Sequence, residues 1–222
     1  GQVERATFAE VLRYLARERR FYGPLMFGMV LMAAYQYGVT AWAIAFFMRI
    51  HGWSPGEIGL LHGLSFIVVG TGASYVGGRW CNRLVAAGRR DATFVIPLVA
   101  GLVALPLTLV FALAGDARVS AVLLVVLTFF GVISFGPGMS TYQLYAPNPM
   151  RAQLTALHSL FSTLVGGGLG PWLTAWFTVR VFGDPKALPQ SMALASTLVL
   201  VPALLSLMVC RHMLLRKAPA AA

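Results

Sequence analysis

The chain has 222 residues, of which 58% are hydrophobic and 11% are charged, and its mean hydropathy is +0.76. A soluble domain carries about 25% charged residues, so this composition excludes an ordinary cytosolic enzyme, a disordered chain and a disulfide scaffold. The net charge of +10 would suggest a nucleic-acid partner in a soluble protein, but its distribution along this chain favours membrane topology instead. The two cysteines, Cys81 and Cys210, form no CxxC motif for a metal or a redox reaction.

Six segments are apolar and long enough to cross a bilayer, which takes roughly 20 residues of helix. No strand-like alternation is sustained, so the sequence predicts an all-α integral membrane protein. We expect a six-helix bundle over residues 21–214. Its helices should cover about 21–48, 57–78, 92–114, 119–143, 152–179 and 188–210.

Local signals support these boundaries. Residues 54–57 (Ser-Pro-Gly-Glu) form a capping box that should open the second helix, and 148–149 (Asn-Pro) should open the fifth. Pro97, Pro106 and the Gly-Pro-Gly at 136–138 should kink the third and fourth helices. Membrane helices tolerate such residues where neighbouring helices cover the freed backbone groups.

Residues 1–20 are different in character from the spans. Phe8, Val11, Leu12 and Leu15 recur at helical spacing, and arginines occupy other positions between and after them. This pattern indicates a basic amphipathic helix along the cytoplasmic membrane surface. The alternative is a disordered linker that happens to hold a few apolar residues.

The basic residues predict the orientation of the chain. If both ends are cytoplasmic, thirteen of the 17 Lys and Arg lie on the cytoplasmic side and four on the other. The positive-inside rule therefore predicts cytoplasmic ends, including a tail at 215–222, in a bacterial-type inner membrane. The thirteen are Arg5, Arg13, Arg17, Arg19, Arg20, Arg79, Arg83, Arg89, Arg90, Arg151, Arg211, Arg216 and Lys217, and the four are Arg49, Arg118, Arg180 and Lys186.

The segment after the second helix contains Gly78, then Asn82-Arg83, then Gly88-Arg89-Arg90. This order resembles the cytoplasmic loop motif of the major facilitator superfamily, in which Gly, three residues and Asp-Arg precede Gly-Arg-Arg. Here Asn82 stands where the family has an acid, and the spacer to Gly88 is longer. The resemblance implies that the glycine permits close helix approach and that the charged residues brace one conformational state.

A second block carries the resemblance further. Pro149-Met150-Arg151-Ala152 followed by residues 166–171 (Gly-Gly-Gly-Leu-Gly-Pro) resembles the eleventh helix of the family, and more closely its Spinster-like branch. Residues 1–20 resemble the central cytoplasmic linker. The resemblance implies that this chain is the C-terminal half of a twelve-helix transporter, with a 3+3 inverted repeat and a missing N-terminal half. A first residue of Gly rather than Met fits a piece of a longer protein.

In that architecture, the first helix of each triplet lines a central cavity. Polar side chains within the spans are costly unless they face water, substrate or partner groups, so they are the candidate cavity residues. Hydrogen bonding between helices is the alternative for each of them, and Tyr142 could instead serve an inner gate. The candidates are Tyr35, Gln36, Thr40, His62, Ser134, Tyr142 and His158.

Charged side chains are absent from the depth of every expected span. A proton-coupled transporter normally needs a buried carboxylate, so a coupling proton or ion would require an acid of the missing half, although His62 and His158 can in principle carry protons. The sequence predicts a secondary transporter of a small organic solute by alternating access, embedded in the lipid bilayer, with no cofactor, metal, nucleic acid or catalysis. The alternative is a self-contained six-helix membrane enzyme or scaffold.

Overall fold

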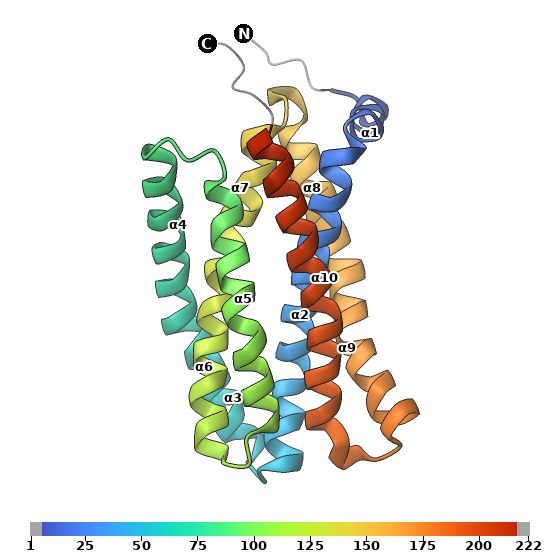
Figure 1. The fold of residues 1–222 in the computed structure, drawn as a ribbon. Coiled ribbons are helices and arrows are strands. Elements are labelled where there is room, and N and C mark those ends of the chain that lie inside the picture. The colour runs from blue at the N-terminus through green and yellow to red at the C-terminus, as the bar shows by residue number, and fades with distance from the viewer. Residues whose placement is uncertain (1–5, 217–222) are drawn as a thin grey trace.

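The computed structural model describes residues 6–216, and these residues form helices joined by short turns, without a β-strand among them (Figure 1). The first helices follow the capping signals: Thr7 with Glu10, and Ser54 with Glu57, each form the reciprocal side-chain-to-backbone bonds of a capping box. The elements up to residue 113 are α1 (Phe8–Arg17), α2 (Arg19–Ile50), α3 (Pro55–Leu64), the π-helical turn η1 (Ser65–Gly70), α4 (Thr71–Ala86) and α5 (Ala92–Leu113).

The second part of the chain is built in the same way. Its elements are α6 (Ala117–Ile133), α7 (Phe135–Tyr145), the 3-10 turn η2 (Asn148–Met150), α8 (Arg151–Phe161), the π-helical turn η3 (Ser162–Gly166), α9 (Gly167–Trp176), the π-helical turn η4 (Phe177–Phe182), the 3-10 turn η5 (Pro185–Ala187) and α10 (Leu188–Arg216). Consecutive elements continue one another, so η1 joins α3 and α4 into rod 55–86, and η3 and η4 extend α8 and α9 into rod 151–182.

Six long helical rods stand side by side in the described part of the chain (Figure 1). Five are long and apolar enough to cross a membrane: 19–50, 55–86, 92–113, 117–145 and 185–216. Rod 151–182 is equally long but less apolar, because it holds four glycines between 166 and 170 and an arginine near each end. The fold is therefore an all-α membrane bundle, in agreement with the sequence-based class.

Two expectations about helix ends need correction. The second span does not end at residue 78 but continues to Ala86, so Gly78, Asn82 and Arg83 lie on a helix and not in a loop. No glycine with positive φ or proline interrupts residues 79–86, and long arginine side chains can reach the interface from a helix end. The fourth span breaks at Ser134, and Pro137 is tolerated because it falls in the first turn of α7.

Helix α2 is the centre of the bundle. It packs against α9, α10 and η3, while α5 packs between α10 and α6 (Figure 1). Ser206 of α10 donates a hydrogen bond to the Pro24 carbonyl of α2 at 2.8 Å, and Gly38 of α2 meets Gly170 of α9 backbone to backbone. Small residues at these crossings let the helices approach closely, which is how membrane helices gain packing energy.

Helix α1 lies across one end of the bundle and is seen end-on in Figure 1. Val11 is fully buried, and the Tyr14 and Tyr22 hydroxyls are 3.4 Å apart, so α1 is attached to the start of α2. The α4–α5 turn and the last turn of α10 lie at the same end (Figure 1), which we call the α1 end. Arg5, Lys217 and the rest of residues 1–5 and 217–222 lie outside the described residues.

Candidate functional site

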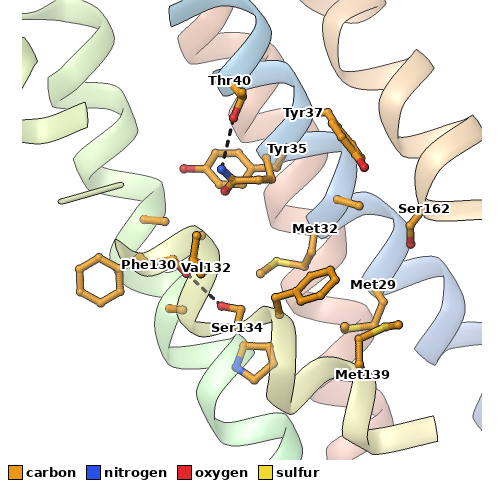
Figure 2. A pocket seen from close by; sticks show the side chains of 18 of the residues that line it. Met29, Met32, Tyr35, Tyr37, Thr40, Phe130, Val132, Ser134, Met139 and Ser162 are labelled. Carbon is orange, nitrogen blue, oxygen red and sulfur yellow. Dashed lines mark hydrogen bonds between the residues drawn. The ribbon is translucent and has the colours of Figure 1, made fainter. Parts of the chain in front are cut away.

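A cavity of about 620 Å³ lies between the rods, with walls from α2, rod 55–86, α5, α6–α7 and rod 151–182 (Figure 2). Its size falls in the range of small-molecule sites in proteins, roughly 300–1,000 Å³. Several lining aromatic side chains are exposed, with Phe135 at 70% and Tyr37 at 42% exposure, so the cavity reaches the surface of the described bundle.

Five of the seven predicted cavity residues line this cavity: Tyr35, Gln36, Thr40, Ser134 and His158. His62 lines an adjoining cavity of about 10 Å³ that shares Tyr35, Gln36 and Thr40 with the larger one. Neither ring nitrogen of His62 has a hydrogen-bond partner in the described chain.

Tyr142 is the seventh candidate, and it does not line the cavity. Its side chain is fully buried and stacks on the His158 ring, with the ring centroids 4.7 Å apart and the planes 24° from parallel. His158 in turn lies within 3.3 Å of the Ser162 hydroxyl through its Nε2. Tyr142 therefore acts on the cavity through His158.

Hydrogen bonds order the polar side chains of α2. Thr108 donates to the Ala104 carbonyl at 2.7 Å, so the 2.6 Å contact between Tyr35 and Thr108 must be a hydrogen bond donated by the Tyr35 hydroxyl. The Gln36 amide donates to the Thr40 hydroxyl at 3.3 Å (Figure 2). Gln36 also presses on Gly131, where an added Cβ would lie 2.0 Å from the Gln36 Oε1 atom.

Sequence reasoning missed the thioethers and the second-helix hydroxyls of this cavity. Met29, Met32 and Met139 line it (Figure 2), and so do Thr71 and Ser74. Methionine within an apolar span gives no signal that separates a lining position from a lipid-facing one. No Asp, Glu, Lys or Arg lies among the described residues that line the cavity.

The motif residues of rod 55–86 and the following turn lie at the α1 end. The close helix contact there is made by Gly77, where a Cβ would come within 2.5 Å of the Ile133 carbonyl oxygen of α6. Gly78 has no atom near its Cβ position, so the expectation of a close approach at Gly78 is wrong for the described bundle. Asn82 and Arg83 are exposed, and their side chains make no hydrogen bond within residues 6–216.

A buried acid organises the turn after α4. Gly88 has φ +75°, which ends α4 and turns the chain toward α5. Asp91 follows and accepts hydrogen bonds from Arg89 at 3.0 and 3.1 Å and from Arg211 of α10 at 2.7 Å. These bonds hold the pKa of the Asp91 carboxyl below its usual range, chiefly through Arg89.

Further hydrogen bonds connect the same end. The Tyr145 hydroxyl of α7 donates to the Arg90 carbonyl, and Arg151 donates to the Ala146 carbonyl at 3.1 Å. Gln153 of α8 donates to the Ala6 carbonyl at 2.5 Å. Arg89 and Arg90 of the motif therefore take part in a polar network that joins the turn after α4 to α7 and α10, whereas Asn82 and Arg83 do not. The organising residue of this network, Asp91, was not among the predicted site residues.

Comparisons with known proteins agree with this architecture. Residues 2–171 match the family model described as Major Facilitator Superfamily. The chain is 28% identical over 181 residues to an "MFS-type efflux pump" of Mycolicibacterium smegmatis, covering 81% of this chain and 41% of the relative.

Two crystal structures of a bacterial homolog of the human lysosomal transporter Spinster share the fold. The inward-facing, unoccupied structure has a TM-score of 0.77 at 20% identity and covers 99% of this chain and 53% of its own. The occupied structure has a TM-score of 0.65 at 18% identity, with 88% and 48% coverage. The chain thus spans about half the length of the proteins it matches. With the family model matching most of its length, the chain belongs to the major facilitator superfamily, a family of multi-pass membrane transporters.

Proposed function

We propose that this chain is one half of a secondary transporter that moves a small organic solute by alternating access. The observation that carries the proposal is the 620 Å³ cavity, because it lies between five of the rods and no Asp, Glu, Lys or Arg is among the described residues that line it. A cavity of that size in a membrane bundle suits a solute that enters from one side and leaves at the other.

The proposed partner of this half is a second helical unit that closes the cavity. Large apolar side chains at the cavity are exposed, Phe135 at 70% and Phe66 at 39%, and such surface is normally covered by protein or lipid. The relatives are about twice as long as this chain, which supports a second unit of similar size. Any coupling proton or ion is then assigned to an acid of that unit.

The proposed orientation places the α1 end in the cytoplasm. Eleven of the thirteen basic residues predicted to be cytoplasmic are described and lie at this end, and the four others lie toward the opposite end (Figure 1). The positive-inside rule supports cytoplasmic ends for such a distribution and an inner-membrane location. A reporter fused after residue 222 should be active in the cytoplasm, and activity only in the periplasm would refute the orientation.

The proposed gate is the polar network at the α1 end. Asp91 joins the α4–α5 turn to Arg211 of α10, and Asn82 and Arg83 remain exposed beside it for contacts with the second unit. Such contacts can form in one conformation and break in the other, which is how a transporter selects between two states.

The test is solute movement by the complete transporter. The coding sequence that contains this chain should encode about six further spans, and the complete protein in liposomes should accumulate solute where residues 1–222 alone do not. Robust uptake by residues 1–222 alone would refute the half-transporter proposal. A complete protein with no further spans and with a chemical activity would favour the enzyme or scaffold alternative.

A further inference from the structure

Helix α1 lies across the ends of the rods and not along them. Figure 1 shows α1 end-on at the edge of the bundle, while the rods are seen from the side. Its contacts are with the start of α2 and with α8. Because the rods cross the membrane, a helix in this position lies parallel to the membrane surface, where an amphipathic helix can place one face among the lipids.

Contacts with two elements of the bundle hold α1 in this position. Val11 is fully buried, and the Tyr14 and Tyr22 hydroxyls are 3.4 Å apart. The Gln153 side chain of α8 donates to the Ala6 carbonyl just before α1 at 2.5 Å. The faces of α1 that do not contact the bundle therefore have a fixed direction.

One of these faces is apolar and has no cover in the described bundle. Phe8 and Leu12 are 59% and 46% exposed, and residues four apart on a helix lie side by side on one face. We call this pair the apolar edge. Exposed apolar side chains of this size are normally covered by protein or lipid.

A second face of α1 is basic. Arg13 and Arg17 are also four residues apart, and both are exposed. We call this pair the basic row. The Arg13 Nε atom donates to the Ala9 carbonyl at 3.4 Å, but within residues 6–216 neither arginine has an ion pair, because both ion pairs there use Asp91.

Acidic side chains do not neutralise this part of the chain. Residues 6–20 contain four arginines and two acids, Glu10 and Glu18. The Glu10 carboxylate already accepts hydrogen bonds from the Thr7 backbone nitrogen at 2.7 Å and the Thr7 hydroxyl at 2.9 Å. The basic row is therefore available to an external anion.

The order of the faces around α1 matches the layers of a membrane surface. At about 100° per residue, the buried Val11 is followed by Phe8 and Leu12, and then by Arg13 and Arg17. A phospholipid at the same depth offers an acyl chain and then a phosphate. Guanidinium groups bind phosphate through paired charge-assisted hydrogen bonds.

We propose that α1 is a docking surface for anionic phospholipids, with acyl chains against the apolar edge and the lipid phosphate on the basic row. The cytoplasmic leaflet carries such lipids, whereas a protein cover would have to bring both an apolar surface and acids to the same helix. The inference goes beyond the proposed transport function. Because α1 leads directly into α2, a lipid held here fixes the start of the central helix.

The test measures which lipid contacts α1 in the complete transporter. A bimane fluorophore is attached to Leu12→Cys, with the cysteines of the second unit replaced by serine; Cys81 and Cys210 are buried. Phosphatidylcholine vesicles carry the same small mole fraction of either phosphatidylglycerol or phosphatidylcholine with a nitroxide on the acyl chain, which quenches nearby bimane. We expect phosphatidylglycerol to quench about two-fold or more strongly, since one basic residue at the surface changes affinity for anionic lipid about five-fold.

Variants assign this preference to the basic row. Arg13→Gln with Arg17→Gln should make quenching by the two lipids equal, while the apolar edge still keeps the label among acyl chains. Arg118→Gln with Arg180→Gln is the matched control, because it removes the same charge from exposed positions toward the opposite end of the bundle and should retain the preference.

Each other outcome would overturn the docking surface. Equal quenching by the two lipids without the Arg13 and Arg17 substitutions would show contact with the bilayer but no selection of anionic lipid. Absence of quenching by either lipid would show that the second unit covers the apolar edge. A preference that survives Arg13→Gln with Arg17→Gln would place the lipid elsewhere. Uptake of solute is measured separately, so a failure of transport and a failure of lipid docking are distinguishable.

Discussion

Rods 55–86 and 151–182 have the same design. Each begins as an α-helix, passes through a π-helical turn that starts at a serine and ends at a glycine, and continues as an α-helix. Both π-helical turns line the cavity, η1 through Phe66 and η3 through Ser162. Each rod then places a glycine against the first helix of the other triplet, Gly77 on α6 and Gly170 on α2, as an inverted repeat would require.

The two rods differ in how tightly they are held. A Cβ at Gly170 would lie 1.9 Å from the Ala34 carbonyl oxygen and 2.8 Å from the Gly38 nitrogen, and Trp42 of α2 donates to the Pro171 carbonyl at 2.9 Å. Both rods have exposed outer faces, with Ile67 and Val179 each at 68% exposure, so the difference lies in the crossing: a Cβ at Gly77 would meet one backbone atom closely, the Ile133 carbonyl oxygen at 2.5 Å. Rod 151–182 therefore belongs to the rigid centre, and rod 55–86 is free to contact lipid or a second unit.

The largest effect is predicted for a substitution at the tight crossing of α9 with α2. Gly170→Ala should destabilise the protein by about 3 kcal/mol or more, because the added methyl group meets backbone atoms that cannot rotate away. Thermal unfolding in detergent measures the loss. Gly168→Ala is the matched control two residues away, where the Cβ position has no atom within 4 Å, and equal stability of the two variants would contradict the crossing.

A smaller effect is expected at the looser rod. Gly77→Ala should destabilise by about 1–3 kcal/mol, because α6 can shift from the Ile133 carbonyl more easily than α2 can shift from α9. Gly78→Ala should leave the stability of this bundle unchanged, since its Cβ position is open. A greater loss at Gly78 than at Gly77 would show that the motif glycine packs against the second unit.

The contrast between these glycines shows where sequence reasoning reached its limit. The helix count, the all-α class and five of the cavity residues followed from apolar length and from the cost of polar groups in a membrane. The facing glycine did not, because the motif indicates Gly78, whereas the packing of α4 on α6 turns the neighbouring Gly77 toward the Ile133 carbonyl, and only tertiary contacts fix that register. Asp91 was missed because its partner Arg211 lies far along the chain.

Asp91 attaches the α1 end of rod 55–86 to Arg211 of α10. Removing this attachment should have an effect of intermediate size. Asp91→Asn or Arg211→Ala should destabilise the protein by about 1–2 kcal/mol, less than a fully buried pair, because the Arg211 side chain is 38% exposed. Unfolding midpoints measure both variants. Arg83→Ala is the comparison, and an equal loss there would argue against Asp91 as the attachment.

Substitutions at the cavity should change solute affinity, whereas substitutions at the proposed gate should change turnover. Gln36→Ala removes the amide that bonds Thr40 at the cavity, so we expect a several-fold loss of solute affinity in the complete transporter. Arg83→Ala should slow turnover several-fold at unchanged affinity, because Arg83 is exposed at the α1 end and does not line the cavity. Binding and uptake measured separately decide this, and the reverse pattern would exchange the two assignments.

The smallest predicted effect is the pH dependence of the Asp91 attachment. The pKa of Asp91 is lowered by its bonds to Arg89 and Arg211, so the carboxylate stabilises the folded protein above its ordinary pKa of about 4. That stabilisation is lost only as the pH falls through the lowered pKa. The stability difference between the wild type and Asp91→Asn should therefore stay constant from pH 8 to pH 5 and shrink below about pH 4. Unfolding midpoints across this range measure it, and a difference that already shrinks between pH 7 and pH 5 would mean that Asp91 titrates with a raised pKa and that the loose rod is released within the physiological range.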